Sequence, residues 1–186
     1  MSQEQVDINS IINGCKRQDP KSQKELVMNF APYLLSTAKR FCNDNVSPKD
    51  ILQESYILIF KNFQQYDSSI SSLKTWMNRI VINTALKYLR QRHIKYELPT
   101  ESIEDEQIEV PEILSNLQFD EIIKLVQKLP IGYREVFNLY VFDDYSHEEI
   151  AKALSITPST SRSQLARARK LLKEQVQSLI NELERI

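Results

Sequence analysis

The sequence predicts an all-α protein made of two small helical domains joined by a flexible acidic linker. Only two of the 186 residues are glycine, and hydrophobic residues make up 41% of the chain. A composition rich in Leu, Ile, Lys and Glu and poor in glycine favours helices over sheets and tight turns. Apolar residues recur at helical spacing in both halves of the chain, and its length suits two small domains.

The division into domains rests on the distribution of charge, since the net charge is only −1. Residues 74–95 and 158–173 carry Lys and Arg but no acid, whereas residues 97–121 carry nine acids and no base. The acidic block also holds Pro99 and Pro111, and such a composition cannot bury a core of its own. We therefore predict an N-terminal domain over 1–95, a linker over 96–116 and a C-terminal domain over 117–186.

The N-terminal domain is predicted to be a helical bundle. Ile8, Ile11, Ile12 and Cys15 form a short apolar stripe. Asp19-Pro20 is typical of a helix start, and Pro32 should bend or break the helix that follows. Ser47-Pro48 begins another helix, in which Asp50 can reach back as a capping-box acid. The next helix starts near Ser72, with Leu73, Met77, Ile80, Thr84 and Tyr88 on one face.

The C-terminal domain is predicted to contain four helices. The first covers roughly 117–128, and the second runs from Pro130 to about Phe142. Ser146 and Glu149 fit a capping box that opens a short third helix ending at Leu154. A three-residue turn follows, and Thr157-Pro158 begins a fourth helix that runs past Leu172.

The last two helices form a helix-turn-helix pattern, in which the second helix enters the major groove of DNA. At 100° per residue, Ser161, Leu165, Ala168 and Leu172 share the inner face, and Arg169 falls close to it. The same geometry predicts an outer face, opposite the first, where small residues, hydroxyls and cations suit base edges and phosphates. The outer face consists of Ser159, Ser163, Ala166, Arg167 and Lys170, and Arg162 flanks it. The candidate DNA contacts are Ser159, Thr160, Arg162, Ser163, Ala166, Arg167 and Lys170. The alternative is a solvated surface helix, but such a face normally mixes charges of both signs.

A second basic helix carries a candidate site for unpaired bases. An aromatic ring beside arginines and an amide can combine stacking with attraction to phosphate. The candidates at this spacing are Trp76, Arg79, Asn83, Lys87 and Arg90. A lone Trp at such a position is more often a core residue, and Ile82 and Leu86 lie near the same face as Trp76, so part of this face can pack against another helix.

The sequence provides no candidate for catalysis, metal binding or a cofactor. It has no glycine-rich phosphate loop and no nucleophile with a matching base. Two cysteines, Cys15 and Cys42, and two histidines, His93 and His147, lack metal-ligand spacing. We therefore expect a non-enzymatic protein. The chain has no run of about 20 apolar residues and no signal-peptide pattern, so we expect a cytoplasmic protein without an integral membrane segment.

Three blocks in this order resemble the extracytoplasmic-function branch of the sigma-70 family. Residues 50–66, DILQESYILIFKNFQQY, are similar to the family's Asp-x-x-Gln-Glu helix. Residues 73–90, LKTWMNRIVINTALKYLR, resemble its minus-ten segment, and residues 129–173 resemble its minus-35 domain. The chain departs from the family pattern at Ser71-Ser72, at Ser155 and at Pro158-Ser159-Thr160-Ser161, where the family often has glycine nearby.

The resemblance implies a binding protein with defined partners. It implies that Asp50, Gln53 and Glu54 contact the clamp of the bacterial RNA polymerase core. It also implies that the set from Trp76 to Arg90 binds the melted minus-ten element. The last basic helix would bind the minus-35 element. The polymerase flap and an anti-sigma factor are further implied partners. A stand-alone helix-turn-helix regulator would explain residues 117–186 but not the Asp50–Glu54 motif. Two more possibilities are an enzyme with an unrecognised site and an interaction protein that uses the acidic segment.

Overall fold

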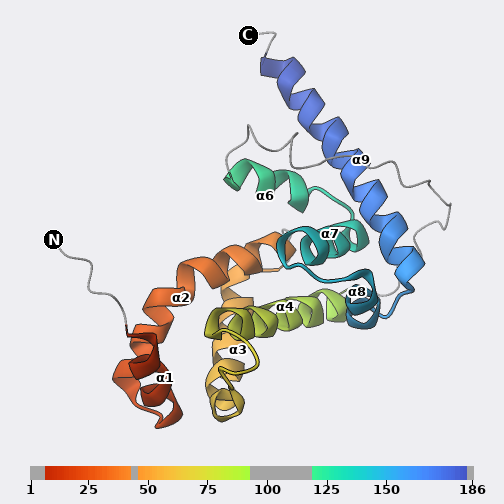
Figure 1. Ribbon diagram of the computed structural model, residues 1–186. Coiled ribbons are helices and arrows are strands. Elements are labelled where there is room, and N and C mark those ends of the chain that lie inside the picture. Colours follow the sequence, from red (N-terminus) through yellow and green to blue (C-terminus); the bar gives the residue numbers. More distant parts are fainter. Residues whose placement is uncertain (1–6, 43–45, 93–118, 184–186) are drawn as a thin grey trace. The chain divides into compact units, whose positions relative to one another are not determined.

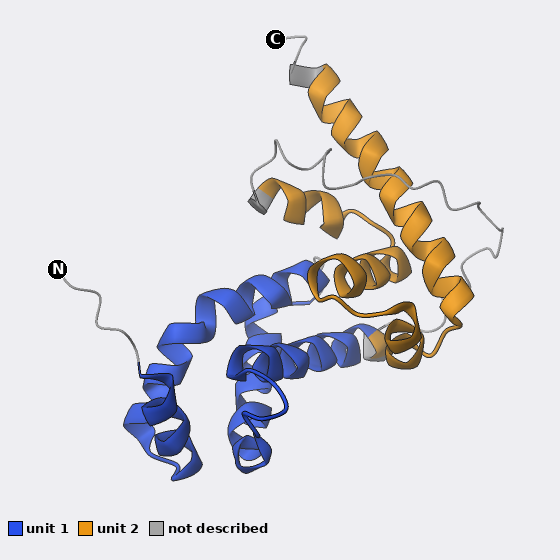
Figure 2. Ribbon diagram, viewed as in Figure 1, with its two compact units in different colours: residues 1–89 blue, residues 90–186 orange. Residues whose placement is uncertain are grey.

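The computed structural model describes residues 7–42, 46–92 and 119–183, and every regular element within these ranges is helical (Figure 1). The all-α prediction is therefore confirmed. The chain divides into two compact units, residues 1–89 and 90–186 (Figure 2). The predicted linker, 96–116, lies outside the described residues. No helix in the described ranges is long and apolar enough to span a bilayer.

The described residues of unit 1 form three α-helices, a short 3-10 turn and most of a fourth α-helix. They are α1 (Ile8–Lys16), α2 (Pro20–Phe41), α3 (Pro48–Lys61), η1 (Phe63–Gln65) and α4, which begins at Leu73 and ends at Arg92. The Asp19 carboxylate accepts a hydrogen bond from the Ser22 N–H at 2.8 Å, as expected for the cap of α2. The Ser72 hydroxyl accepts the Thr75 N–H at 3.1 Å, which confirms the predicted start of α4. Ser47 precedes α3 as predicted but its side chain makes no capping hydrogen bond.

Helix α2 continues through Pro32, so the predicted break does not occur. Proline removes the hydrogen bond that its own N–H would give to the carbonyl of residue 28. Met28 is exposed, so water can satisfy that carbonyl. The exposed side of a long helix is where the loss of one hydrogen bond costs least.

The core of unit 1 is formed where α2 packs on α1 and on α3. Its fully buried side chains include Leu26, Leu34, Phe41, Ile51, Ile59 and Met77. The buried Thr37 hydroxyl donates to the Asn78 side-chain oxygen at 2.7 Å, which joins α2 to α4. Gly14 permits the close approach of α1 and α2, because a Cβ there would lie 1.9 Å from the Ser22 Oγ.

The described part of unit 2 after α4 contains four α-helices and a π-helical turn. They are α6 (Phe119–Gln127), α7 (Ile131–Phe137), the π-helical turn η2 (Asn138–Phe142), α8 (His147–Leu154) and α9 (Pro158–Leu183). The predicted helix from Pro130 to Phe142 is therefore two elements, since α7 widens into η2 after Phe137. The Ser146–Glu149 capping box is confirmed, with the Ser146 hydroxyl accepting the Glu149 N–H at 3.2 Å.

The turn between α8 and α9 depends on one left-handed residue. Ser155, the C-cap of α8, has φ 57° and ψ 43°. The Thr157 hydroxyl then accepts the Thr160 N–H at 3.0 Å and caps α9. Both α7 and α8 pack on α9. The predicted inner face of α9 is confirmed, because Ser161, Leu165, Ala168 and Leu172 are all buried.

Candidate functional site

The basic face of α4 presents its charged and amide side chains to solvent. Arg79, Asn83, Lys87 and Arg90 are all exposed, and they recur at three- and four-residue intervals on one side of the helix. Ile82 and Leu86, which helical geometry puts near this face, are buried. The polar side chains of the predicted face are therefore exposed, and its apolar border is buried.

Trp76 takes part in an aromatic cluster at the start of α4. Its ring meets Phe63 edge-on, with centroids 5.6 Å apart and planes at 83°, and lies 5.3 Å from Tyr66. The Tyr66 hydroxyl donates to the Ser71 carbonyl at 3.2 Å, which ties the cluster to the segment before α4. Trp76 is half-buried. The Trp76 side chain thus packs in the cluster and remains partly accessible, so the core and the ligand-binding interpretations are compatible.

Helix α3 exposes a face that includes the predicted polymerase contacts. Asp50 and Gln53 are exposed, and Glu54 is half-buried. Ile57, one turn after Gln53, is 67% exposed, although it is a large apolar side chain. The sequence analysis missed Ile57; the signal for it is its position at i+4 from Gln53, on the side opposite Ile51, Ser55 and Ile59.

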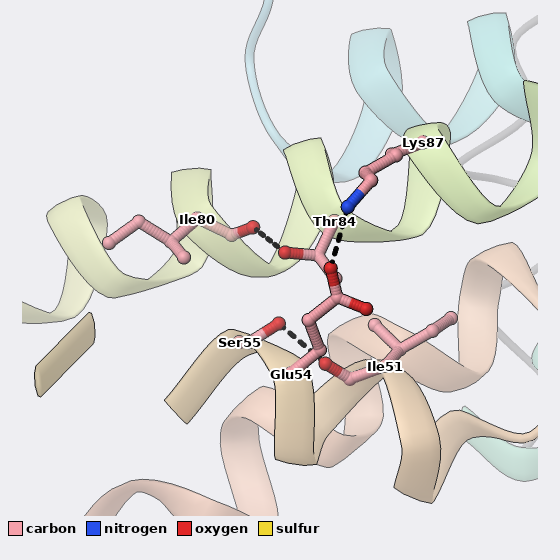
Figure 3. A network of polar contacts seen from close by, with 6 residues as sticks. All are labelled: Ile51, Glu54, Ser55, Ile80, Thr84 and Lys87. Carbon is pink, nitrogen blue, oxygen red and sulfur yellow. Dashed lines mark hydrogen bonds and ion pairs between the residues drawn. The ribbon is translucent and has the colours of Figure 1, made fainter. Parts of the chain in front are cut away.

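Glu54 and Lys87 form an ion pair across α3 and α4, with 2.8 Å between the Lys87 Nζ and a Glu54 carboxylate oxygen. Figure 3 shows the two side chains extending toward each other from the two helices. The hydrogen bonds from Lys87 and from Tyr88 hold the pKa of the Glu54 carboxyl below its usual value. Residues predicted for two separate interfaces therefore contact each other.

Two small polar residues near this ion pair, Ser55 on α3 and Thr84 on α4, have locally satisfied hydroxyls. Ser55 and Thr84 are fully buried. Each hydroxyl donates to a carbonyl of its own helix, Ser55 to Ile51 at 2.7 Å and Thr84 to Ile80 at 2.8 Å (Figure 3). Neither hydroxyl needs a partner on the other helix, so both buried polar groups are satisfied locally. Glu54 directly precedes Ser55, and Lys87 lies one turn after Thr84, so both charged residues belong to regular helix.

Helix α9 presents most of the predicted DNA contacts outward. Ser159, Arg162 and Lys170 are exposed, while Thr160 and Ser163 are half-buried. The last two predicted contacts, Ala166 and Arg167, are less exposed than the spacing of 100° per residue predicts.

Ala166 is only 7% exposed, and Arg167 is half-buried, with its Nη1 3.5 Å from the Tyr133 hydroxyl. Arg169 lies over the Tyr140 ring, with 5.8 Å between its guanidinium carbon and the ring centroid. This position agrees with the expectation that Arg169 lies near the apolar face.

Among the described residues, no group of three or more His, Cys, Asp or Glu side chains is placed to hold a metal ion. Cys15 and Cys42 are both buried free thiols. Burial, with a smaller contribution from Asp19, raises the pKa of the Cys15 thiol to about 11. A thiol of this kind stays protonated near neutral pH and is a poor metal ligand or nucleophile.

Comparison with known families and proteins identifies two conserved regions in the chain. Residues 26–93 match Sigma-70 region 2, and residues 119–172 match Sigma-70, region 4. The chain is 29% identical to the ECF RNA polymerase sigma-E factor of Salmonella typhimurium over 189 aligned positions, covering 95% of this chain and 98% of that protein. It is 26% identical to the RNA polymerase sigma-H factor of Pseudomonas aeruginosa, covering 92% and 95% of the two chains.

Two solved structures share the fold. CnrH, solved in complex with the cytosolic domain of CnrY, superposes with a TM-score of 0.52 at 18% identity, covering 90% of this chain and 96% of that one. The sigma factor RpoE of Bartonella quintana, solved with the anti-sigma factor NepR, gives a TM-score of 0.52 at 20% identity, covering 81% and 94%. With both sigma regions present in order and relatives matched along nearly their whole length, the chain belongs to the extracytoplasmic-function branch of the sigma-70 family of RNA polymerase sigma factors.

Proposed function

We propose that this sigma factor directs the RNA polymerase core to its promoters through three separate binding surfaces. The exposed face of α3 docks on the polymerase clamp, α4 binds the melted minus-ten element, and α9 binds the minus-35 duplex, with unit 2 also contacting the flap. The observation that carries this proposal is that three solvent-exposed faces coincide with the two matched sigma regions.

The α3 face has the composition of a protein interface. Asp50 and Gln53 offer an anion and an amide, and Ile57 adds an exposed apolar group between them and the end of the helix. An apolar centre beside polar groups that can pair with a partner is common in protein interfaces. Ile57 is therefore included in the proposed polymerase contact with Asp50, Gln53 and Glu54.

The α4 face suits unpaired DNA. Arg79, Lys87 and Arg90 can pair with phosphates, and Asn83 can bond to an exposed base edge. The half-buried Trp76 ring, ordered by Phe63 and Tyr66, is the aromatic group available for stacking. Because these contacts form only with a melted strand, their binding free energy shifts the duplex toward the open state.

The α9 face suits duplex DNA. Ser159 and Thr160 lie in its first turn, where side chains of a recognition helix reach base edges. Arg162 and Lys170 are exposed cations that can hold the backbone, and Arg167, Ser163 and Ala166 complete the proposed surface. Phosphate contacts would set the position of the helix, and base contacts its sequence preference.

In this proposal the chain contributes binding alone, without a cofactor, and the polymerase performs the chemistry in the cytoplasm. An anti-sigma partner is part of the proposal, because the solved relative RpoE is held by the anti-sigma factor NepR. A stand-alone helix-turn-helix regulator is not favoured, because it would leave the region 2 match over residues 26–93 without a role.

The test of the function is in-vitro transcription with purified core polymerase on a genomic promoter library. We expect transcripts that depend on adding the chain and that start downstream of a shared pair of sequence elements. The same experiment reports those elements. Sequence-specific duplex binding by the free chain, with no chain-dependent transcripts, would instead support a stand-alone regulator.

The α3 assignment is tested by Gln53→Lys. Gln53 is exposed, so this change should leave the fold intact while placing a cation in the proposed interface, and we expect at least about tenfold weaker binding to core polymerase. The matched control is Gln65→Lys, an identical change at an exposed residue of η1. Binding is measured by titrating labelled chain with core, and helical content by circular dichroism. Equal affinity of a folded Gln53→Lys variant and the control would contradict the assignment.

A further inference from the structure

Glu54 and Lys87 belong to two proposed interfaces, one for polymerase and one for DNA, yet they are paired with each other. The Lys87 side chain remains 57% exposed and that of Glu54 29% exposed, so both can be reached by a partner without unfolding. Ser55 on α3 and Thr84 on α4 are buried near the pair (Figure 3). The pair is therefore an ordered but accessible contact between the two interfaces.

The charges of the pair oppose DNA binding in the free chain. The ammonium of Lys87 attracts phosphate, but a carboxylate 2.8 Å away cancels much of that attraction and repels the phosphate directly. A polymerase group that donates hydrogen bonds or positive charge to Glu54 would neutralise this carboxylate. Lys87 would then act on DNA with its full charge.

We propose that the Glu54–Lys87 pair couples the two interfaces, with Glu54 masking Lys87 in the free chain and releasing it for phosphate when Glu54 engages the polymerase. This proposal rests on the proposed function. Under it, Glu54 is a positioning residue for Lys87 as well as a polymerase contact. Because coupling between two ligands is reciprocal, bound DNA would also strengthen the attachment of α3 to polymerase.

The alternative is that the pair only ties α3 to α4. A tie of that kind would affect the stability of the bundle, but removing Glu54 would then not strengthen DNA binding. The two possibilities therefore differ in sign for DNA affinity, and a double-mutant cycle distinguishes them.

The experiment measures binding of the full-length free chain to a fluorescent mixed-sequence single-stranded oligodeoxynucleotide of about 20 nucleotides, longer than most single binding grooves require. Low salt, about 50 mM, keeps phosphate contacts measurable. We expect Glu54→Gln to bind about threefold to fivefold more tightly than the unmodified chain, the range expected for release of a partly exposed ion pair. Lys87→Ala should remove this gain, so that Glu54→Gln has no effect in the Lys87→Ala background.

Two controls isolate the pair. Glu25→Gln removes the same charge from an exposed position on α2 and should not change the affinity. Lys87→Arg keeps the cation and its partner, so Glu54→Gln should again tighten binding in that background. A gain that persists in the Lys87→Ala background would assign the effect to general electrostatics and overturn the proposal. Failure of folded Glu54→Gln to bind more tightly than the unmodified chain would overturn it as well.

A second measurement separates this proposal from the proposed function. With core polymerase at saturation, Lys87→Ala should weaken binding to a pre-melted promoter template, while Glu54→Gln should no longer increase affinity. If Lys87→Ala has no effect in the holoenzyme, Lys87 is not a DNA contact and that part of the proposed function fails. Lys87→Ala could instead weaken holoenzyme binding while the effects of Glu54→Gln and Lys87→Ala are additive in the free chain. In that case the proposed function stands, and the proposal that Glu54 masks Lys87 is wrong.

Discussion

Arg167 and Lys170 lie one turn apart on α9 but have different surroundings. Lys170 is exposed, whereas Arg167 is half-buried beside the Tyr133 hydroxyl of α7. A guanidinium has five N–H donors in a fixed plane, so the contact with the Tyr133 hydroxyl helps to set the orientation of the Arg167 donors. An ordered arginine of this kind suits base recognition, and a solvated lysine suits phosphate.

These surroundings predict different effects of two alanine substitutions on minus-35 recognition. Arg167→Ala should relax sequence preference at one position, with a loss of about 1–3 kcal/mol of discrimination. Lys170→Ala should weaken binding about equally for all sequences and reduce the salt slope by about one unit. Both are measured by competition binding of the holoenzyme to single-base variants of the upstream element at several salt concentrations.

Tyr133→Phe tests whether the Tyr133 hydroxyl orients Arg167, since this change removes the hydroxyl and keeps the ring. It should reduce discrimination at the same base position as Arg167→Ala, by a smaller amount. An unchanged specificity profile in Arg167→Ala, together with an altered one in Lys170→Ala, would reverse the two roles.

Helical geometry explains why the residue-scale prediction was only partly right. An angle of 100° per residue correctly put Ser161, Leu165 and Leu172 on the buried face of α9. The same geometry put Arg167 on the opposite face, but it cannot predict which side chains of other helices contact that face. Tyr133 comes from another element, so the contact to Arg167 could not be predicted from the sequence of α9.

At the scale of elements, the turn between α8 and α9 sets the geometry of the helix-turn-helix. Ser155 takes a left-handed conformation there, with φ 57°. This position normally favours glycine, because a Cβ crowds the backbone in that region. The Ile156 N–H donates to the Ala151 carbonyl at 3.1 Å across the turn, so the conformation is held by the helix end.

The strain at Ser155 predicts a stabilising substitution. Ser155→Gly should raise the free energy of unfolding by about 0.5–1 kcal/mol, because relief of the left-handed strain exceeds the greater freedom of glycine in the unfolded chain. Ser178→Gly, at an exposed position within α9, is the matched control and should lower stability by about 0.5–1 kcal/mol. Urea unfolding of the full chain measures both, and effects of the same sign would contradict the assignment of strain.

The helix starts were predictable because their signals are local. Asp19-Pro20, Ser146 with Glu149, and Thr157-Pro158 each place a capping group and its backbone partners within four residues. The π-helical turn at Asn138–Phe142 was missed because no residue in it breaks the helical spacing. The passage of α2 through Pro32 depends on which side of the helix faces water, and that is decided by the packing of the whole unit.

At the scale of the whole molecule, the proposed function combines one face for melted DNA on α4 with one for duplex DNA on α9. The sequence pointed to both basic helices through the distribution of charge. It did not reveal that Glu54 and Lys87 meet, because they are 33 positions apart and belong to different helices. Contacts of this kind depend on how helices cross, which side-chain periodicity within each helix cannot define.

The two faces should act on different steps of initiation. Anchoring by α9 requires only duplex DNA, so a loss there should reduce transcription from duplex and pre-melted promoters alike. Binding by α4 requires an unpaired strand, so its contribution to opening is needed only when the template begins as a duplex. Asn83 is exposed on the α4 face and is uncharged, which makes it a suitable probe of this step with little effect on general attraction to phosphate.

We therefore expect Asn83→Ala to reduce transcription from a duplex promoter more than from the same promoter pre-melted over the minus-ten element. One lost hydrogen bond to a base edge is worth about 1 kcal/mol, which corresponds to roughly fivefold on the duplex template. Lys170→Ala provides the comparison from unit 2 and should reduce transcription from both templates by a similar factor. The measurement is single-round transcription with core polymerase at saturation. Equal losses on the two templates for Asn83→Ala would make Asn83 a simple contact without a role in opening, and no loss on either would remove it from the α4 interface.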